Sequence, residues 1–301
     1  MRLARFRPSR SSTAERAHIG LVVGGAVLNL SEAIPSLPTD MIEVLAASDG
    51  WFEQIAGACD KAPSYDLAAV ELLSPIACPR KVLGIGLNYP AHAAEGGAKV
   101  PDVQHWFNKQ NSCVNGPNAP VHMPRASTQL DYEGELVVVI GRRARHVPRD
   151  RALEHVAGYM VGNDVSVRDW QLRSPTTTVG KSFDTHGPIG PWITTSDEVP
   201  DPGALQLRTF VNGDQRQATS TSAMVFSVPE MIEYLSTAFT LEPGDLLFTG
   251  TPEGVGLLLE PPRFLTVGDR VRVEIDGLGA IENEVVAESH EPQPAQPQTK
   301  E

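Results

Sequence analysis

The chain has 301 residues, of which 41% are hydrophobic, so it can bury one large core or one core with a small accessory domain. Its net charge of −12 argues against nucleic-acid and membrane-surface binding, because no basic tract is long enough to follow phosphates. No apolar run reaches the length of a transmembrane helix, and the three cysteines lack paired or zinc-binding spacing. We therefore expect a cytoplasmic protein with reduced thiols.

The chain divides into three predicted segments. Residues 1–77 predict a small N-terminal α+β domain, which ends at a join punctuated by Pro75 and Pro79. Residues 78–288 contain most of the strand-like runs and predict the main domain. Residues 289–301 are rich in Pro and Gln and predict a disordered tail.

Local patterns favour strands over helices. Residues 40–60 place apolar side chains at helical intervals, and a second helix is expected after Ser227, which has capping-box spacing to Glu230. The pair Asn212-Gly213 predicts a two-residue hairpin turn. Many short strands with scattered helices predict an α+β, mostly β fold, built on a mixed β-roll or sandwich.

An acidic pair precedes one of the most apolar stretches, DYEGELVVVIG, at residues 131–141. Glu133 and Glu135 point to one face of a strand, with Cα atoms roughly 7 Å apart. Two explanations are open. The carboxylates lie in water or pair with Arg142 and Arg143, or they hold a divalent cation.

Asp164 is a candidate third ligand, since it ends the apolar run GYMVGND. The alternative is that Asp164 caps the short helix expected after it. Three carboxylates leave positions of an octahedral ion for water and substrate, which suits Mg²⁺ or Mn²⁺.

A histidine and a glutamate lie within an earlier glycine-rich stretch, GIGLNYPAHAAEGG, at residues 84–97. His92 and Glu95 share a face of a helical turn, so the carboxylate can orient the imidazole as a base. The flanking glycines would let residues 89–98 move as a lid. The alternative is a surface pair of little consequence. Lys181 and Thr251 lie in further glycine-rich turns, where the alternative for Lys181 is a solvated amine.

Seven stretches, in this order, resemble the fumarylacetoacetate hydrolase family. The resemblance covers about residues 78–288, and residues 1–77 resemble the small N-terminal domain of longer bacterial members. Seven collinear stretches make the resemblance specific. They are NYPAHAAE, DYEGELVVVIG, GYMVGNDVSVRDWQ, GKSFDTHGPIGP, VNGDQRQ, MVFSVPEMIEYLS and LEPGDLLFTGTPEGVG.

The resemblance implies a site and a dimer. It implies a homodimer with one Mg²⁺ or Mn²⁺ per subunit, held by Glu133, Glu135 and Asp164. It makes His92 and Glu95 the water-activating pair. The remaining residues that it places around a small 2-oxo or diketo acid substrate are Lys181 as a catalytic group, with Arg168, Gln171, Thr251 and Tyr89 as substrate contacts.

The function expected from the resemblance is metal-dependent hydrolysis of a C–C bond in an acylpyruvate or related 2,4-dioxo acid. A 2-oxo acid decarboxylase, tautomerase or hydratase on the same site is the alternative, and a catalytically silent β module is a third hypothesis. The substrate is not inferred from any one relative. The reason is a polar run that departs from the common family pattern in a segment expected to border the pocket, Lys109-Gln110-Asn111. A further candidate for the pocket wall is His186.

Overall fold

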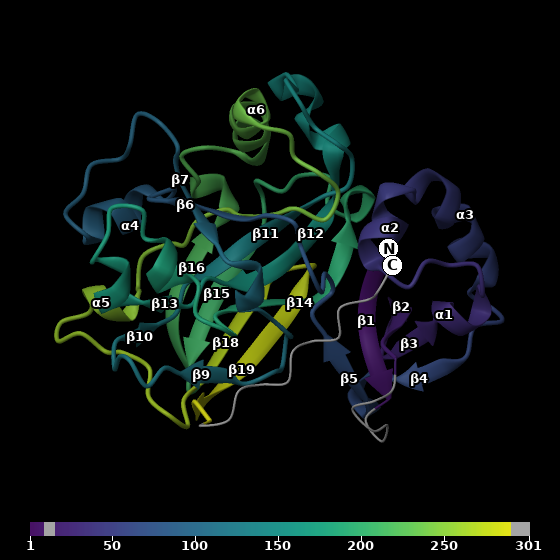
Figure 1. Ribbon diagram of the computed structural model, residues 1–301, viewed down its shortest axis with the longest axis horizontal. Coiled ribbons are helices and arrows are strands. Elements are labelled where there is room, and N and C mark those ends of the chain that lie inside the picture. Colours follow the sequence, from purple (N-terminus) through teal and green to yellow (C-terminus); the bar gives the residue numbers. More distant parts are fainter. Residues whose placement is uncertain (9–15, 290–301) are drawn as a thin grey trace.

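The computed structural model describes residues 1–8 and 16–289, and strands dominate it (Figure 1). Residues 290–301, most of the predicted tail, lie outside the described residues. The fold is mostly β, with mixed sheets and few helices, as the sequence predicts. None of the helices in the described part of the chain is long and apolar enough to cross a membrane.

The N-terminal segment forms a module at one end of the molecule (Figure 1). Residues 40–60 are helical as predicted, but in two pieces that meet at Ala47. The turn at Gly24 has a positive φ of 57° and joins two antiparallel strands. The elements of the module are β1 (Arg2–Pro8), β2 (His18–Val23), β3 (Ala26–Asn29), β4 (Ser64–Asp66), β5 (Val70–Leu73), α1 (Leu30–Ala33), α2 (Met41–Ala46) and α3 (Ser48–Ala58).

One large sheet runs through both the module and the main part of the chain. Its order is β4-β3-β2-β1-β14-β12-β11-β17-β6-β7, with β5 on β1 and β8 on β14. The junction is the antiparallel pairing of Leu3 with Ile193. The remaining strands of this sheet are β6 (Val82–Gly86), β7 (His105–Lys109), β8 (Val114–Asn115), β11 (Gly134–Ile140), β12 (Val156–Asn163), β14 (Gly187–Thr195) and β17 (Leu246–Phe248).

A second sheet packs against one face of the first. Its order is β16-β15-β18-β19-β9, and β10 pairs with β13 in a separate ladder. The Asn212-Gly213 turn joins β15 to β16, with φ values of 54° and 87° that match the predicted hairpin. The strands are β9 (Val121–Met123), β10 (Leu130–Asp131), β13 (Ser166–Val167), β15 (Gln206–Val211), β16 (Asp214–Ser220), β18 (Arg270–Ile275) and β19 (Gly279–Ala287).

Both faces of β11 are buried, which explains its unbroken apolar sequence. Leu136 and Val138 lie in the core shared with the second sheet, together with Val273. Val137 and Val139 point the other way, into a core shared with the N-terminal module. The strand that begins at the acidic pair is therefore fixed from both sides.

The helices of the main part are few and short. The longest has the expected capping box, in which the Ser227 backbone N–H donates to Glu230 Oε2 at 2.8 Å. The helices are α4 (Pro90–Glu95), α5 (Arg168–Gln171) and α6 (Val228–Ala238). The 3₁₀ turns are η1 (Leu67–Ala69), η2 (Asn111–Cys113), η3 (Arg149–His155), η4 (Thr178–Lys181), η5 (Ser196–Glu198), η6 (Thr221–Ala223) and η7 (Gly256–Leu258).

Candidate active site

Three carboxylates meet where β11 begins and its neighbour β12 ends. The strands are antiparallel, and Gly134 lies opposite Asn163, so Glu133 and Glu135 come next to Asp164. The three residues are buried, and each offers a carboxylate oxygen within 4.8 Å of the others. The structure thus brings together the three residues that the sequence suggested as ligands.

The simpler explanations for these acids are wrong. Val167, not Asp164, occupies the N-cap position of α5. Arg143 pairs with Glu242 at 3.2 Å instead of with the acidic pair. The acids therefore serve neither as a helix cap nor as a solvated strand end.

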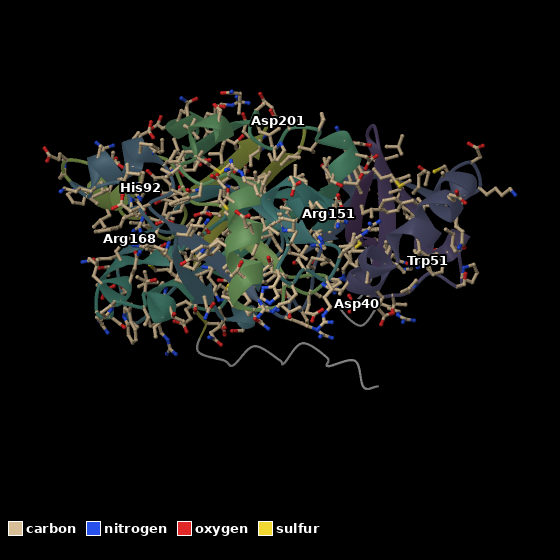
Figure 2. The ribbon with its side chains drawn as sticks, turned by 90° about the horizontal axis from the view of Figure 1, so that it is seen from above. Asp40, Trp51, His92, Arg151, Arg168 and Asp201 are labelled. Carbon is tan, nitrogen blue, oxygen red and sulfur yellow. The ribbon has the colours of Figure 1, made fainter. Side chains whose placement is uncertain are left out.

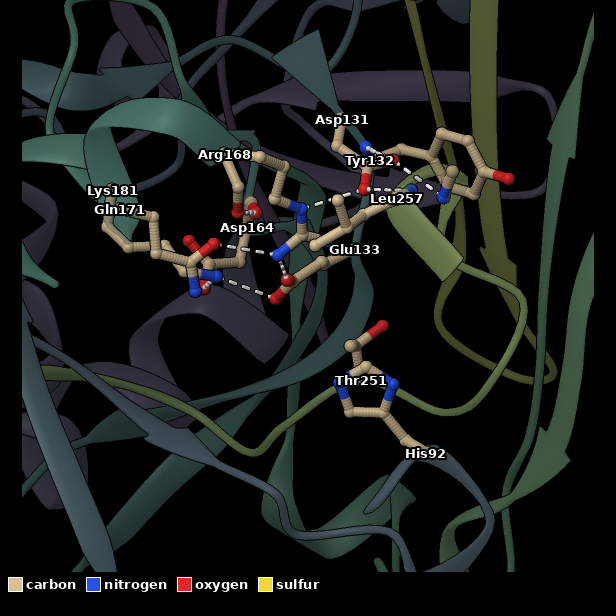
Figure 3. A network of polar contacts seen from close by, with 12 residues as sticks. His92, Asp131, Tyr132, Glu133, Asp164, Arg168, Gln171, Lys181, Thr251 and Leu257 are labelled. Carbon is tan, nitrogen blue, oxygen red and sulfur yellow. Dashed lines mark hydrogen bonds and ion pairs between the residues drawn. The ribbon is translucent and has the colours of Figure 1, made fainter. Parts of the chain in front are cut away.

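Basic side chains surround the acidic trio. Lys181 Nζ lies 2.7 Å from both Glu133 Oε2 and Asp164 Oδ2, and it is buried instead of solvated. Arg168 Nη1 donates to Glu133 Oε1 at 2.5 Å. Lys109 Nζ donates to Asp164 Oδ1 at 2.6 Å. Figure 3 shows Lys181 and Arg168 converging on Glu133.

The members of the trio differ in their electrostatic surroundings. Burial opposes the charge on Glu133, but Lys181 and Arg168 outweigh burial and lower its pKa to about 2. Burial, Asp164 and Glu133 all raise the pKa of Glu135 well above its usual value. The hydrogen-bond donor to Glu135 is the neutral Gly250 N–H, at 2.7 Å. Of the three carboxylates, Glu135 is therefore the one whose charge the protein leaves uncompensated.

These residues fit a divalent cation. An all-carboxylate oxygen set suits Mg²⁺ or Mn²⁺ and is unusual for structural zinc. Two of the carboxylates already have lysine or arginine partners, whereas the charge on Glu135 needs a further positive group. A cation held by Glu133, Glu135 and Asp164 would supply it.

Asp131 holds Arg168 and a distant loop together. Its Oδ2 accepts from Arg168 Nε at 2.8 Å and from Leu257 N at 2.9 Å. Its Oδ1 accepts from Gly256 N at 2.8 Å and from Tyr132 N at 2.9 Å. Arg168 is thereby fixed by two carboxylates, and its Nη2 is a buried donor with no partner among the described residues.

His92 and Glu95 lie on α4, close to the acidic trio. His92 Nδ1 is 3.4 Å from Glu95 Oε2, and both side chains are partly buried. Glu95 also accepts from Gly254 N at 3.0 Å, so the carboxylate is anchored to the loop after β17. Figure 3 places the imidazole of His92 opposite Glu133. Burial and the Gly254 contact distinguish this pair from an isolated surface pair.

The other predicted substrate contacts differ in whether their polar groups already have hydrogen-bond partners within the protein. Thr251 accepts from Gln217 Nε2 at 2.8 Å and donates to the Gly134 carbonyl at 3.1 Å, so its hydroxyl is engaged within the protein. Gln171 Oε1 accepts from Arg168 Nη1 at 2.9 Å. The hydroxyl of Tyr89 is buried and has no partner among the described residues.

Close backbone contacts bring these segments together. A Cβ added at Gly180 would lie 2.2 Å from the Gln171 backbone nitrogen, so a side chain there would push Lys181 away from α5. Gly250 has a φ of 96° and donates its N–H to Glu135. These two glycines therefore set the distance between Lys181, Glu135 and their neighbours.

Sequence reasoning missed Asp131 and Gln217 and gave Lys109 no specific role. Gln217 Oε1 accepts a hydrogen bond from Gly134 N, and Gln217 Nε2 donates one to Thr251, so Gln217 joins β11 to the loop that follows β17. The feature of the sequence that could have indicated Gln217 is its position as the last residue of the motif VNGDQRQ. For Asp131 the signal is a third acid beside the Glu133–Glu135 pair.

The predicted site residues lie together at the end of the molecule away from the module. Figure 2 shows His92 and Arg168 towards one end of the molecule, whereas Trp51 lies in the module at the other. A cleft of about 790 Å³ lies nearby, lined in part by Trp170, Phe183 and His186, but the acidic trio does not line it. The chemistry therefore belongs to the polar cluster and not to this cleft.

A mostly-β, two-sheet fold with a buried acidic trio next to a His–Glu pair defines an enzyme whose site is suited to a divalent cation. Residues 81–286 match the family model described as fumarylacetoacetate (FAA) hydrolase C-terminal. The chain therefore belongs to the fumarylacetoacetate hydrolase family.

Similar proteins include members with different reactions. The mitochondrial oxaloacetate tautomerase of Xenopus laevis is 41% identical over 95% of this chain and 90% of its own length. The maleylpyruvate hydrolase of Sphingobium sp. SYK-6, solved with manganese(II) and pyruvate, has 34% identity and a TM-score of 0.80 over 96% of this chain and 100% of its own. The fumarylacetoacetate hydrolase of Exiguobacterium antarcticum has 35% identity and a TM-score of 0.82 over the same shares.

Proposed function

We propose that this chain is a divalent-metal-dependent hydrolase that cleaves a C–C bond of an acylpyruvate or related 2,4-dioxo acid. The observation that carries the proposal is the His92–Glu95 pair, anchored to Gly254 and facing the acidic trio. Hydrolysis needs a base that activates water, and a histidine oriented by a carboxylate supplies one near neutral pH. The relative solved with manganese(II) and pyruvate supports both the cation and the class of substrate.

The residues around the trio have distinct roles in this proposal. A cation bound by Glu133, Glu135 and Asp164 would polarise the oxygens of the 2-oxo acid. The Nη2 of Arg168 and the Tyr89 hydroxyl are buried, have no partner in the described part of the chain, and are donors available to the substrate. Lys181 offsets the negative charge that develops on the pyruvyl oxygen as the bond breaks.

His92 acts on water in this proposal. Its imidazole removes a proton from a water molecule, and the hydroxide adds to the distal carbonyl carbon. The C–C bond then breaks, its electron pair passes to the pyruvyl half as an enolate, and that carbon is protonated. The products are a carboxylic acid and pyruvate. Glu95 keeps the imidazole oriented, and α4 covers the site against other water.

Tautomerisation of a 2-oxo acid such as oxaloacetate is the second candidate. It is favoured by the 41% identity to an oxaloacetate tautomerase along almost the whole chain. This reaction needs the same polarised carbonyl and a base that moves a proton at C3, but no attacking water. Decarboxylation would use the same enolate.

A homodimer also remains a prediction from the family resemblance.

The test compares two variants with wild type on an acylpyruvate and on oxaloacetate. We expect His92→Ala to reduce acylpyruvate cleavage by about 10²- to 10⁴-fold, the usual effect of losing a general base, while oxaloacetate decarboxylation falls much less. Lys181→Met should depress both, because Lys181 acts on the shared enolate. Wild type that cleaves no acylpyruvate, but tautomerises oxaloacetate in a His92-dependent manner, would replace the hydrolase proposal with the second candidate.

A further inference from the structure

Lys109 is a buried cation whose donors are all engaged within the protein. It ends β7, and its ammonium group donates to Asp164 Oδ1 at 2.6 Å, to the His186 carbonyl at 3.1 Å and to the Lys181 carbonyl. An ammonium group has three N–H donors, and here three acceptors take them. Lys109 therefore has no donor left for a substrate and can act only through its neighbours.

These contacts place Lys109 behind two site residues. Lys109 holds one oxygen of Asp164, and Lys181 holds the other. Lys109 also fixes the backbone at Lys181, and thus the origin of that side chain. An error in the position of Lys109 would move a candidate cation ligand and the enolate-stabilising lysine together.

The formal charges of the buried cluster give Lys109 a second importance. Four negative and three positive charges leave the cluster at −1, and a divalent cation changes this to +1. A ligand with a negative charge is then attracted to the loaded site. Without Lys109 the loaded site would be neutral. The groups counted are Asp131, Glu133, Glu135, Asp164, Lys109, Arg168 and Lys181.

We propose that Lys109 is a positioning residue that makes the cation-loaded site net positive, so that the site holds an anionic 2-oxo acid. This inference rests on the proposed function, since it assumes a cation and an anionic substrate at the trio. It adds that anion affinity depends on a residue that does not touch the anion. A unit charge a few ångströms away, at an effective dielectric constant near 20, changes binding by about tenfold or more.

The experiment separates binding of the cation from binding of the anion. Mn²⁺ affinity is measured by electron paramagnetic resonance, and oxalate affinity of the Mn²⁺-loaded protein by calorimetry. For Lys109→Met we expect Mn²⁺ affinity near that of wild type, because the loss of a repelling charge offsets the loss of one contact to Asp164, whose other oxygen is still held by Lys181. We expect oxalate to bind at least about tenfold more weakly, with a smaller dependence on salt.

Lys81→Met is the matched control. Lys81 Nζ lies 2.6 Å from Asp245 Oδ2, and Asp245 is fully buried, so this variant also removes a lysine from a buried aspartate. Lys81 and Asp245 directly precede β6 and β17, and the Asp245 carbonyl accepts from Ile140 N at the end of β11 opposite to the trio. We expect Lys81→Met to lower the melting temperature but leave oxalate binding unchanged, which separates general destabilisation from the effect on the anion.

Lys109→Gln keeps two amide N–H donors but carries no charge, so it extends the test if the Met variant folds poorly. It should lose oxalate affinity as well. Oxalate affinity within twofold of wild type in either folded variant, or the same loss in Lys81→Met, would overturn the role of Lys109. Wild-type protein that binds neither Mn²⁺ nor oxalate would instead refute the proposed function itself.

Discussion

Asp131→Asn tests how the carboxylate that joins Arg168 to the Gly256 loop stabilises the fold. Asn has nearly the same shape as Asp, so packing is preserved while one oxygen becomes an NH₂ group. Each oxygen of Asp131 accepts two N–H groups, and the side chain is completely buried. Whichever way the amide is turned, two donors would face another donor.

The size of the effect follows from these contacts. Of the carboxylates in the described residues, Arg168 would retain Glu133 alone, and removing one partner of a buried ion pair costs about 3–5 kcal/mol. For a chain of this length each kcal/mol lowers the melting temperature by roughly 2 °C, so we expect a decrease of about 6–10 °C.

The assay is thermal unfolding followed by circular dichroism or calorimetry at neutral pH. Asp66→Asn is the control, because Asp66 is exposed and accepts from Ala68 N at 2.9 Å as a helix cap, a role that Asn fills equally well. A decrease of less than about 2 °C for Asp131→Asn, equal to that of the control, would show that the Asp131 contacts contribute little.

Two further predictions concern the metal and the pH. Glu135→Gln should abolish activation by Mg²⁺ or Mn²⁺ and leave the melting temperature of the metal-free protein unchanged or higher, because the uncompensated carboxylate is gone; full activity of this variant after exhaustive chelation would contradict the ligand assignment. Burial of His186 lowers its pKa to about 3, and its Nε2 lies 2.8 Å from the His122 carbonyl. The neutral form is therefore favoured in the folded state. The contribution of His186 to the free energy of unfolding is complete above pH 6.5. It falls by about 1.4 kcal/mol per pH unit as the pH drops from 6.5 towards 3, because the imidazole of the unfolded chain takes up a proton. Melting curves from pH 7 to pH 4 should show a steeper loss for wild type than for His186→Phe, and parallel losses would exclude His186 as the cause.

The site was predictable where the regular spacing of a strand or a helix places two polar side chains on the same face. Glu133 and Glu135 share a face because strand side chains alternate, and His92 and Glu95 share a helical turn. The resemblance to the family then supplied Asp164, which periodicity alone could not separate from a helix cap.

Contacts between distant segments were not predictable in this way. Asp131 meets Gly256 and Leu257 across more than a hundred positions, and Gln217 meets Thr251 across 34 positions. The engaged hydroxyl of Thr251 has the same cause, since only the folded chain shows which acceptor lies nearby. Likewise, the sequence places Lys109 in a polar run but does not show that it meets Asp164.

The pairing of β1 with β14 decides where the large sheet ends. Strand β14 pairs with β8 at Gly187 and Pro188, but without β1 its part at Ile193 and Thr194 would stand at an edge, with free N–H and C=O groups on which another chain could assemble. The module continues the sheet through β1, β2 and β3, so that this edge is the three-residue strand β4, which carries Asp66. A short strand with a charged residue is a poor template for further strand addition. The N-terminal module thus protects the protein against edge-to-edge aggregation.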